Sequence, residues 1–336
     1  MKHDKILLEH GGGGLLSHEL ISQLFLPRFR NPYLERLEDS AVLNIGNQKM
    51  CFTTDSYVVS PTFFPGGNIG SLAVCGTVND LAVCGGKPLF LSCGVIVEEG
   101  FPMSSLETIL DTMAEKAAHA GVQIVTGDTK VVARGAADGI FINTSGIGVI
   151  EYPSPLSVKS IAPGDAVIVN GTLGDHGAAV IAARENLSLS SHLISDTAPL
   201  NGLIADILQA GPHVHCMRDA TRGGLGAILA EIAKSAGMRI DVDEKSIPVQ
   251  DNVRGICEIL GFDPLYLANE GKMVVFCAES DAPAVLQAMQ KHRYGQNAAV
   301  IGRVSASSSS RVILKTTIGG ERLIDLPTGE LVPRIC

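Results

Sequence analysis

Residues 69–86, IGSLAVCGTVNDLAVCGG, decide the fold of this chain. The stretch has the length of a helix, and apolar residues occur on most of its sides, so the pattern predicts a helix that is buried all round. Strand-like runs flank it at 49–55, KMCFTTD, and at 90–99, FLSCGVIVEE. A buried helix between strands predicts an α/β chain in which a sheet lies against that helix.

Three further elements complete the first half of the chain. A second helical pattern opens with Ser104 and Glu107, which have the spacing of a capping box, and it stops at Gly121. We expect strands after this helix at 122–128, VQIVTGD, and at 140–150, IFINTSGIGVI. The first half is therefore predicted to be one sheet with two helices.

A Pro- and Ser-rich stretch at 151–165 connects the first half to a second one with a similar alternation. We expect domains at 1–155 and 156–325, each a mixed β-sheet covered by helices, followed by a flexible tail at 326–336. The elements expected in the second half are strands at 166–171, 272–278, 299–304 and 311–316, and helices near 175–187, 197–210, 223–237, 252–261 and 282–292.

Composition and charge favour an enzyme and exclude two other classes. The 336 residues are 46% hydrophobic but only 4% aromatic, with 37 glycines, which suits an α/β enzyme better than an interaction hub built on aromatic anchors. A net charge of −9 without a basic cluster argues against nucleic-acid binding. No apolar run has the roughly 18–20 residues of a membrane span, and a signal peptide pattern is missing. We expect a soluble, cytoplasmic protein.

Seven of the eight cysteines lie within the two halves, and Cys336 ends the chain. None forms a CxxC pair or a zinc-site spacing, and most lie in apolar runs, so they are predicted to be reduced and buried. Cys336 differs because it follows LPTGELVPRI, a segment without periodicity that is predicted to be mobile.

Three lone carboxylates lie in stretches that otherwise look buried. Asp55 ends one strand, Asp80 lies within the buried helix, and Asp128 follows another strand. A single such residue is most often a cap or a salt bridge, because an ionised carboxylate out of water is costly unless it is paired. Three of them together make a shared Mg²⁺ site plausible, since Mg²⁺ prefers carboxylates and phosphate oxygens.

Glycine-rich turns suggest that the chain handles phosphate. HGGGG at 10–14 lets the backbone approach an anion closely, and RDATRGGL at 218–225 places glycines beside Arg222 at the start of a helix. The stretch at 171–186 has a similar turn. These glycines could instead make only tight turns, and Lys130 and Glu270 could be solvated loop charges.

The motifs together resemble the HypE family of hydrogenase maturation proteins, and the resemblance runs from the first glycines to the terminal PRIC. One departure is Gly12, where many members have Ser. The segments RDATRGG and TGDTKVV are shared more loosely with aminoimidazole ribonucleotide synthetase, selenophosphate synthetase and thiamine monophosphate kinase, whose two-domain fold is the PurM-like architecture. The motifs that carry the resemblance are HGGGG, TTDSYV, FFPGGNIGSLAVCGTVNDLAVCGGKP, TGDTKVV, GTLGDHGAA, RDATRGG, NEGK and PRIC.

The resemblance implies an ATP-dependent carbamoyl dehydratase. In this family a carbamoyltransferase, HypF, delivers a carbamoyl group to the C-terminal thiol, and ATP drives dehydration of the S-carboxamide to a thiocyanate. The cyano group then passes to the HypC–HypD complex as the cyanide ligand of nickel–iron hydrogenase. An amide oxygen is a poor leaving group, so its phosphorylation and the removal of the nitrogen protons by a base make this chemistry feasible.

The resemblance also implies roles for residues. Cys336 is the carrier, and Lys130 and Glu270 line the pocket that receives the thiocarboxamide, with Glu270 as the proton acceptor. The implied Mg²⁺ ligands are Asp55, Asp80, Asp128 and Asp219. The implied nucleotide-binding residues are Gly11, Gly12, Gly13, Gly14, Asp55, Asp80, Asp128, Thr129, Arg222 and Gly223.

Two implications concern the whole molecule. Family members pair their N-terminal sheets, and strands with two apolar faces are consistent with burial on both sides, so we expect a homodimer with its ATP-binding and dimerisation domain at 1–155. Eleven tail residues reach at most ~35–40 Å, so Cys336 could swing between a partner and its own pocket.

Two alternatives remain beside the dehydratase. One is a small-molecule kinase or synthetase of the same superfamily in which Cys336 is incidental. The other is a non-catalytic carrier whose thiol only shuttles a group between partners.

Overall fold

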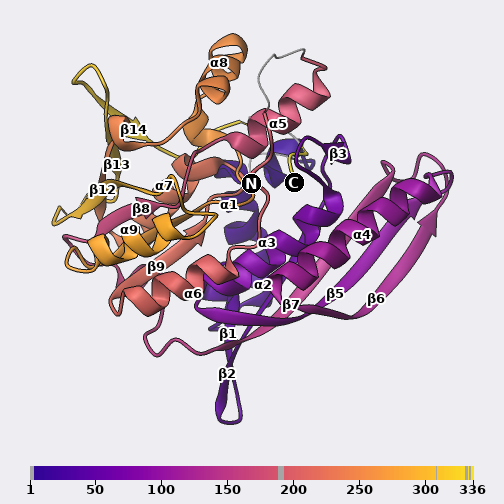
Figure 1. Ribbon diagram of the computed structural model, residues 1–336, viewed down its shortest axis with the longest axis horizontal. Coiled ribbons are helices and arrows are strands. Elements are labelled where there is room, and N and C mark those ends of the chain that lie inside the picture. The colour runs from indigo at the N-terminus through magenta and orange to yellow at the C-terminus, as the bar shows by residue number, and fades with distance from the viewer. Residues whose placement is uncertain (1–3, 188–192, 308, 330–331, 333) are drawn as a thin grey trace.

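A computed structural model describes residues 4–187, 193–307, 309–329, 332 and 334–336. Two mixed sheets, each with helices packed on it, build the molecule, and the C-terminal end of the chain lies between the two halves (Figure 1). The predicted fold class, two α/β domains each built on a mixed sheet, is confirmed. In the part of the chain that the structure describes, no helix is both long and apolar enough to cross a membrane.

The first sheet has the strand order β1-β2-β7-β5-β6, in which only the β5–β6 pair is parallel. Helices α3 and α4 cover one face of it (Figure 1). Its elements are β1 (Ala41–Ile45), β2 (Gln48–Tyr57), α3 (Ile69–Val83), β5 (Gly86–Glu98), α4 (Met103–Ala120), β6 (Gln123–Val132) and β7 (Ile140–Ile150).

The opposite face of this sheet is open in the single chain. Strand β6 is exposed along nearly its whole length. The expected burial of these strands on both sides refers to a homodimer, and in the single chain the helices α3 and α4 cover one face. Large apolar side chains on this face are exposed at Phe52, Phe90 and Ile96.

Helix α3 is buried all round, as its sequence predicts, because it lies between the two halves. It contacts β2, β5 and β7 on one side and β9 (Val214–Asp219) and α6 (Asn201–Ala210) on the other. The Asn68 side chain caps its first turn by accepting hydrogen bonds from the main-chain N–H groups of Gly70 and Ser71. Asp80 is the one α3 residue that is only half-buried, and it lies near the C-terminal end of the helix.

Helix α4 confirms one predicted boundary and corrects the other. The helix ends before Gly121, which adopts a left-handed conformation with φ +69°. The capping box is wrong, because the helix already begins at Met103, after Pro102, and no side chain caps it. Ser104 and Glu107 therefore lie inside the helix.

The second sheet has the order β14-β13-β10-β12-β8-β11-β9 and is antiparallel except for the β10–β13 pair. The predicted strands and helices of this half are present, whereas the sequence reading missed β9, β10 and β14. The remaining elements are β8 (Ala166–Val169), β10 (Arg239–Asp243), β11 (Met273–Cys277), β12 (Ala299–Ser305), β13 (Val312–Lys315), β14 (Glu321–Ile324), α5 (Asp175–Arg184), α7 (Gly224–Ala236), α8 (Asp251–Leu260) and α9 (Ala282–Lys291).

Short elements at the N-terminus and in connections were also missed. Their apolar periodicity is too brief to stand out from a loop. They are η1 (Leu8–Gly11), α1 (Leu15–Leu20), η2 (Ile21–Phe25), α2 (Leu26–Phe29), η3 (Leu34–Arg36), β3 (Phe63–Phe64), β4 (Gly67–Asn68), η4 (Val158–Ser160), η5 (Glu244–Ser246) and η6 (Pro264–Tyr266).

Candidate functional site

The last residues of the chain dock between the two halves. The main-chain N–H groups of Val58 and Ser60 donate to the main-chain oxygens of Cys336 and Arg334, both at 3.1 Å. The Arg334 guanidinium donates in return to the Val58 carbonyl at 3.0 Å. The tail thus extends the end of β2 with a short paired segment, and Cys336 is only 8% exposed.

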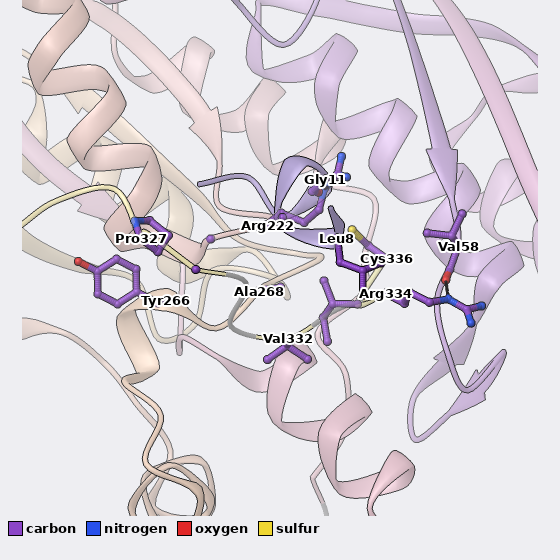
Figure 2. A pocket seen from close by; sticks show the side chains of 14 residues that line it. Leu8, Gly11, Val58, Arg222, Tyr266, Ala268, Pro327, Val332, Arg334 and Cys336 are labelled. Atoms are coloured by element: carbon purple, nitrogen blue, oxygen red, sulfur yellow. Dashed lines mark hydrogen bonds between the residues drawn. The ribbon is translucent and has the colours of Figure 1, made fainter. Parts of the chain in front are cut away.

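Cys336 lines a cavity of about 170 Å³. Its sulfur lies on the side of Arg222 and Gly11, while Arg334 points away toward Val58 (Figure 2). Burial raises the pKa of the Cys336 thiol, and the nearby Glu270 carboxyl adds to this, so the thiol is neutral in this position. The described tail residues therefore occupy the inward of the two expected positions.

The N-terminal glycines pack against the turn that begins α7. Arg222 donates to the Gly11 carbonyl at 3.1 Å and lies 3.9 Å from the Asp55 carboxylate. A side chain on Gly13, whose φ is +75°, would meet the Arg222 main chain at 3.0 Å, so only glycine fits there. Gly11 and Gly12 line the cavity beside Cys336. Sequence positions more than 200 residues apart thus form one glycine-rich rim.

Two other predicted glycines lie at the same rim. Gly223, with φ +76°, is the N-terminal cap of α7 and packs against Gly13. Gly14 is in contact with the start of the tail, since a side chain on it would meet the Pro327 carbonyl oxygen at 2.5 Å. The N–H group of Leu15 donates to the same oxygen at 3.0 Å.

Three of the predicted carboxylates converge beside this rim. Asp55 comes from β2, Asp80 from α3 and Asp219 from the end of β9. Burial raises the pKa of Asp219 to about 8 and that of Asp80 well above its usual range, and the like charges of the neighbouring carboxylates raise both further. Carboxylates that hold protons at neutral pH lack a compensating cation, which fits a site for a bound metal ion.

Sequence reasoning missed a fourth carboxylate in this cluster. Asp39 is ion-paired to Arg218 at 2.6 Å, and its charge raises the pKa of both Asp80 and Asp219. Burial raises the pKa of Asp39 itself. The signal was available, because Asp39 lies two residues before the apolar strand β1, much as Asp55 lies two residues before the end of β2.

Glu270 is buried close to the tail. Its Oε1 atom has no hydrogen-bond partner among the described residues, and burial raises the pKa of its carboxyl well above the usual range. The charges of Asp219 and Asp55 add to this, whereas Arg222 opposes it. An unpartnered buried carboxyl beside the Cys336 pocket is free to bond a group attached to that thiol.

Asp128, Thr129 and Lys130 lie elsewhere. All three are exposed on the edge strand β6, where the Lys130 ammonium pairs with the Asp128 carboxylate at 2.6 Å. Strands β7 and β5 separate β6 from β2, so three strand spacings, roughly 14 Å, stand between Asp128 and Asp55. The structure does not bring these three residues to the Cys336 pocket of the same chain.

The carboxylates are not closed into a metal site by the protein alone. Among the described residues, no group of three or more His, Cys, Asp or Glu side chains is arranged to hold a metal ion. The second glycine turn also serves another purpose than anion binding. The first turn of α5 there carries Asp175, whose carboxylate bonds Thr172 at 2.5 Å and lies 3.8 Å from the Lys272 ammonium.

Comparisons with known proteins find relatives that match this chain over its full length. Models of the N-terminal and C-terminal domains of AIR synthase related proteins match residues 37–150 and 162–315. The carbamoyl dehydratase HypE of Rhodobacter capsulatus is 49% identical over 100% of this chain and 99% of its own length.

Two solved structures are similar over nearly the whole chain. A HypE–HypF complex shares 48% identity with a TM-score of 0.87, covering 92% of this chain and 99% of the other. A HypE structure in complex with ATP shares 44% identity with a TM-score of 0.83, covering 99% of this chain and 100% of the other.

Proposed function

The chain belongs to the HypE family of carbamoyl dehydratases, within the AIR synthase related proteins, and from this premise we propose the reaction that its own residues perform. Cys336 carries a carbamoyl group as an S-carboxamide, and the site removes water from it to leave an S-cyanate. The observation that carries the proposal is the thiol itself, which is docked in a cavity beside Arg222 and near an unpartnered carboxyl.

The amide loses its oxygen and both nitrogen protons in this reaction. When ATP binds, its γ-phosphoryl group converts the amide oxygen into a phosphate leaving group. One nitrogen proton passes to solvent when the amide oxygen is phosphorylated, and the ionised Glu270 carboxylate accepts the other as the C≡N bond forms and phosphate leaves. Its raised pKa supports this role, because a carboxylate that binds protons tightly is the stronger base once ionised.

The residues of the rim fit a nucleotide with its metal ion. Gly11 leaves space for phosphate oxygens, since nothing lies within 4 Å of an added side chain there, and Gly12 lines the same cavity. Gly13, Gly14 and Gly223 shape the rim through their close contacts, and the Arg222 guanidinium offers a positive charge. Asp55, Asp80 and Asp219 would hold Mg²⁺ together with phosphate oxygens, which supply the ligands that the protein lacks. Mg²⁺ would offset the like charges that now raise the pKa of these carboxyls.

The tail needs a second, outward position. A HypE relative forms a complex with HypF, and we propose that HypF carbamoylates the Cys336 of this chain. The buried thiol is neutral, whereas attack on a carbamoyl donor requires a thiolate. Loading therefore takes place outside the pocket, and a HypC–HypD complex receives the cyano group in the same outward position.

A homodimer gives Asp128, Thr129 and Lys130 a place in the reaction. Asp128 and Lys130 lie on the open face of the first sheet, opposite Gly94 and Ile96, and Thr129 is exposed between them on the edge strand, where a second copy would cover them. We propose that they serve the nucleotide site of the second copy, because three strand spacings separate them from Asp55 of their own chain.

Intact-protein mass spectrometry with HypF, carbamoyl phosphate and ATP tests the reaction. We expect a gain of about 43 Da on Cys336 that falls to about 25 Da with ATP, and no gain in Cys336→Ala, because the group is covalently carried. Glu270→Gln should stop at the carbamoyl mass. A wild-type gain that never falls would indicate a carrier, and ATP use without modification would indicate a small-molecule kinase.

A further inference from the structure

His176 joins the docked tail to the second half of the chain. It is the second residue of α5 and is fully buried. Its Nε2 atom lies 2.7 Å from the main-chain oxygen of Ile335, and its Nδ1 atom lies 2.8 Å from the Ser195 hydroxyl. The ring also packs edge-on against Phe64, with 5.3 Å between the ring centroids. The imidazole therefore contacts the residue that immediately precedes the reactive thiol.

The hydrogen bonds around His176 have a defined direction. A carbonyl oxygen can only accept, so Nε2 carries the proton and donates to Ile335. Burial lowers the pKa of His176, which leaves a neutral ring whose Nδ1 accepts from the Ser195 hydroxyl. Ser195 in turn accepts from the Thr197 main-chain N–H at 3.2 Å and from the Thr197 hydroxyl at 2.6 Å. Each donor in this chain has an acceptor.

Asp196, which lies between Ser195 and Thr197, holds the main chain of Glu270 in place. The Asp196 carboxylate accepts the main-chain N–H groups of Glu270 at 3.0 Å and Gly271 at 3.2 Å. It also accepts from the Lys272 ammonium at 2.8 Å. A side chain on Gly271 would lie 2.0 Å from the Asp196 carbonyl oxygen, so the two segments are packed as closely as glycine allows. Residues 195–197 thus contact both His176, which bonds the tail, and the main chain of Glu270, the proposed base.

We propose that His176 is a positioning residue for the dehydration, holding the Ile335 carbonyl so that the group on Cys336 stays in register with Glu270 through residues 195–197. This inference rests on the proposed function. A single neutral hydrogen bond contributes about 1 kcal/mol net, which suits a tail that must be released after each turnover. Two main-chain bonds to Val58 and Ser60 share the docking with it.

Single-turnover dehydration of the carbamoylated protein tests this role. We expect His176→Leu to accept the carbamoyl group from HypF and to keep its KM for ATP, while its dehydration rate falls by about 10- to 100-fold because the group is misplaced. His176→Gln should recover most of the rate, since its amide nitrogen can donate to Ile335. His292→Leu is the matched control, because His292 also makes a hydrogen bond to the main chain, accepting the N–H of Tyr294 after the end of α9.

Alkylation of the unmodified protein by iodoacetamide supplies a second readout. Release of the tail should raise the alkylation rate of Cys336 several-fold in His176→Leu, while the buried Cys75 and Cys216 stay protected and report an intact fold. A His176→Leu protein that matches the wild type in both dehydration and Cys336 alkylation would overturn the inference. If His176→Leu also exposes Cys75, the His176→Gln variant decides. Near wild-type dehydration by His176→Gln supports the role. Loss of dehydration in His176→Gln while its Cys75 stays protected overturns the role.

The two proposals fail in different ways. A wild-type protein that gains the carbamoyl mass and never loses water refutes the dehydration, whereas the alkylation of Cys336 still reports whether His176 holds the tail. A wild type that dehydrates normally while His176→Leu does so equally well refutes only the role of His176.

Discussion

At the scale of single residues, the site is a set of acids kept protonated by burial. Asp219 has a pKa of about 8, against an ordinary value of 3.8. Between these values the folded chain retains a proton that the unfolded chain has released. The contribution of Asp219 to stability is thus complete below about pH 4 and is lost as the pH rises toward 8. At neutral pH the burial of this carboxyl group therefore lowers the stability of the ligand-free protein, and a bound cation would offset that loss.

Asp219→Asn should stabilise the ligand-free protein in a pH-dependent way. An amide cannot ionise, so we expect its free energy of unfolding to exceed that of the wild type by about 1–3 kcal/mol at pH 8 and by little at pH 4.5. Urea unfolding at several pH values measures this. Asp128→Asn is the control, because Lys130 lowers the pKa of that exposed carboxylate and no gain is expected. A constant difference across the pH range would contradict the prediction.

At the scale of elements, the turn before α7 brings the rim glycines and Arg222 together. Gly224 has φ +63°, and a side chain there would meet the carbonyl oxygens of Leu265 and Leu267 at 2.5 Å. These oxygens belong to the segment that leads into Glu270. The start of α7 and that segment therefore share a contact that only glycine permits, and a change in the turn would move both walls of the pocket.

Gly224→Ala should cost about 2–4 kcal/mol of unfolding free energy, the sum of backbone strain and forced displacement. Gly237→Ala at the other end of α7 is the matched control. Its φ is +70°, but nothing lies within 4 Å of the added methyl group, so only the strain of about 1 kcal/mol remains. Denaturant midpoints at an unchanged m-value give the loss of unfolding free energy in each of the two variants. Equal losses would show that the close contact at Gly224 contributes nothing to stability.

At the scale of the whole molecule, the open face of the first sheet is an apolar surface that is exposed in the single chain. Phe90 and Ile96 from β5 share this face with Phe52 from β2, because Phe90 and Phe52 both pair with Ile147 of β7. An apolar sheet face of this kind is ordinarily covered in an assembly. The proposed homodimer accounts for the face and for the position of Lys130 together.

Phe90→Asp should convert the protein from dimer to monomer, because a charge buried between apolar faces is costly. Sedimentation velocity measures the oligomeric state of the variant. The monomer should still be carbamoylated on Cys336 but should lose dehydration if Lys130 acts across the interface. Ile318→Asp is the control, since Ile318 is 94% exposed in a turn of the other half. A Phe90→Asp protein that remains dimeric would place the interface elsewhere.

Sequence patterns predicted most of the elements because their signals are local. Residues 69–86 encode a buried helix in their own composition, and the Gly121 stop needs only its neighbours. The capping box at Ser104 failed for the same reason, since the spacing is local but the helix already begins after Pro102, two residues earlier. Strand β9 was missed because His215, Arg218 and Asp219 interrupt its apolar run.

What the sequence by itself determined is therefore the order of helices and strands, the glycine turns, and a reactive cysteine behind an aperiodic tail. Only the tertiary structure decided which carboxylates meet. It brings Asp55, Asp80 and Asp219 together because α3 lies between the two sheets, and it leaves Asp128 on the far edge of the first sheet. The docking of Ile335 on His176 joins residues 159 positions apart. Such contacts depend on how the sheets pack, and no local pattern in the chain records that.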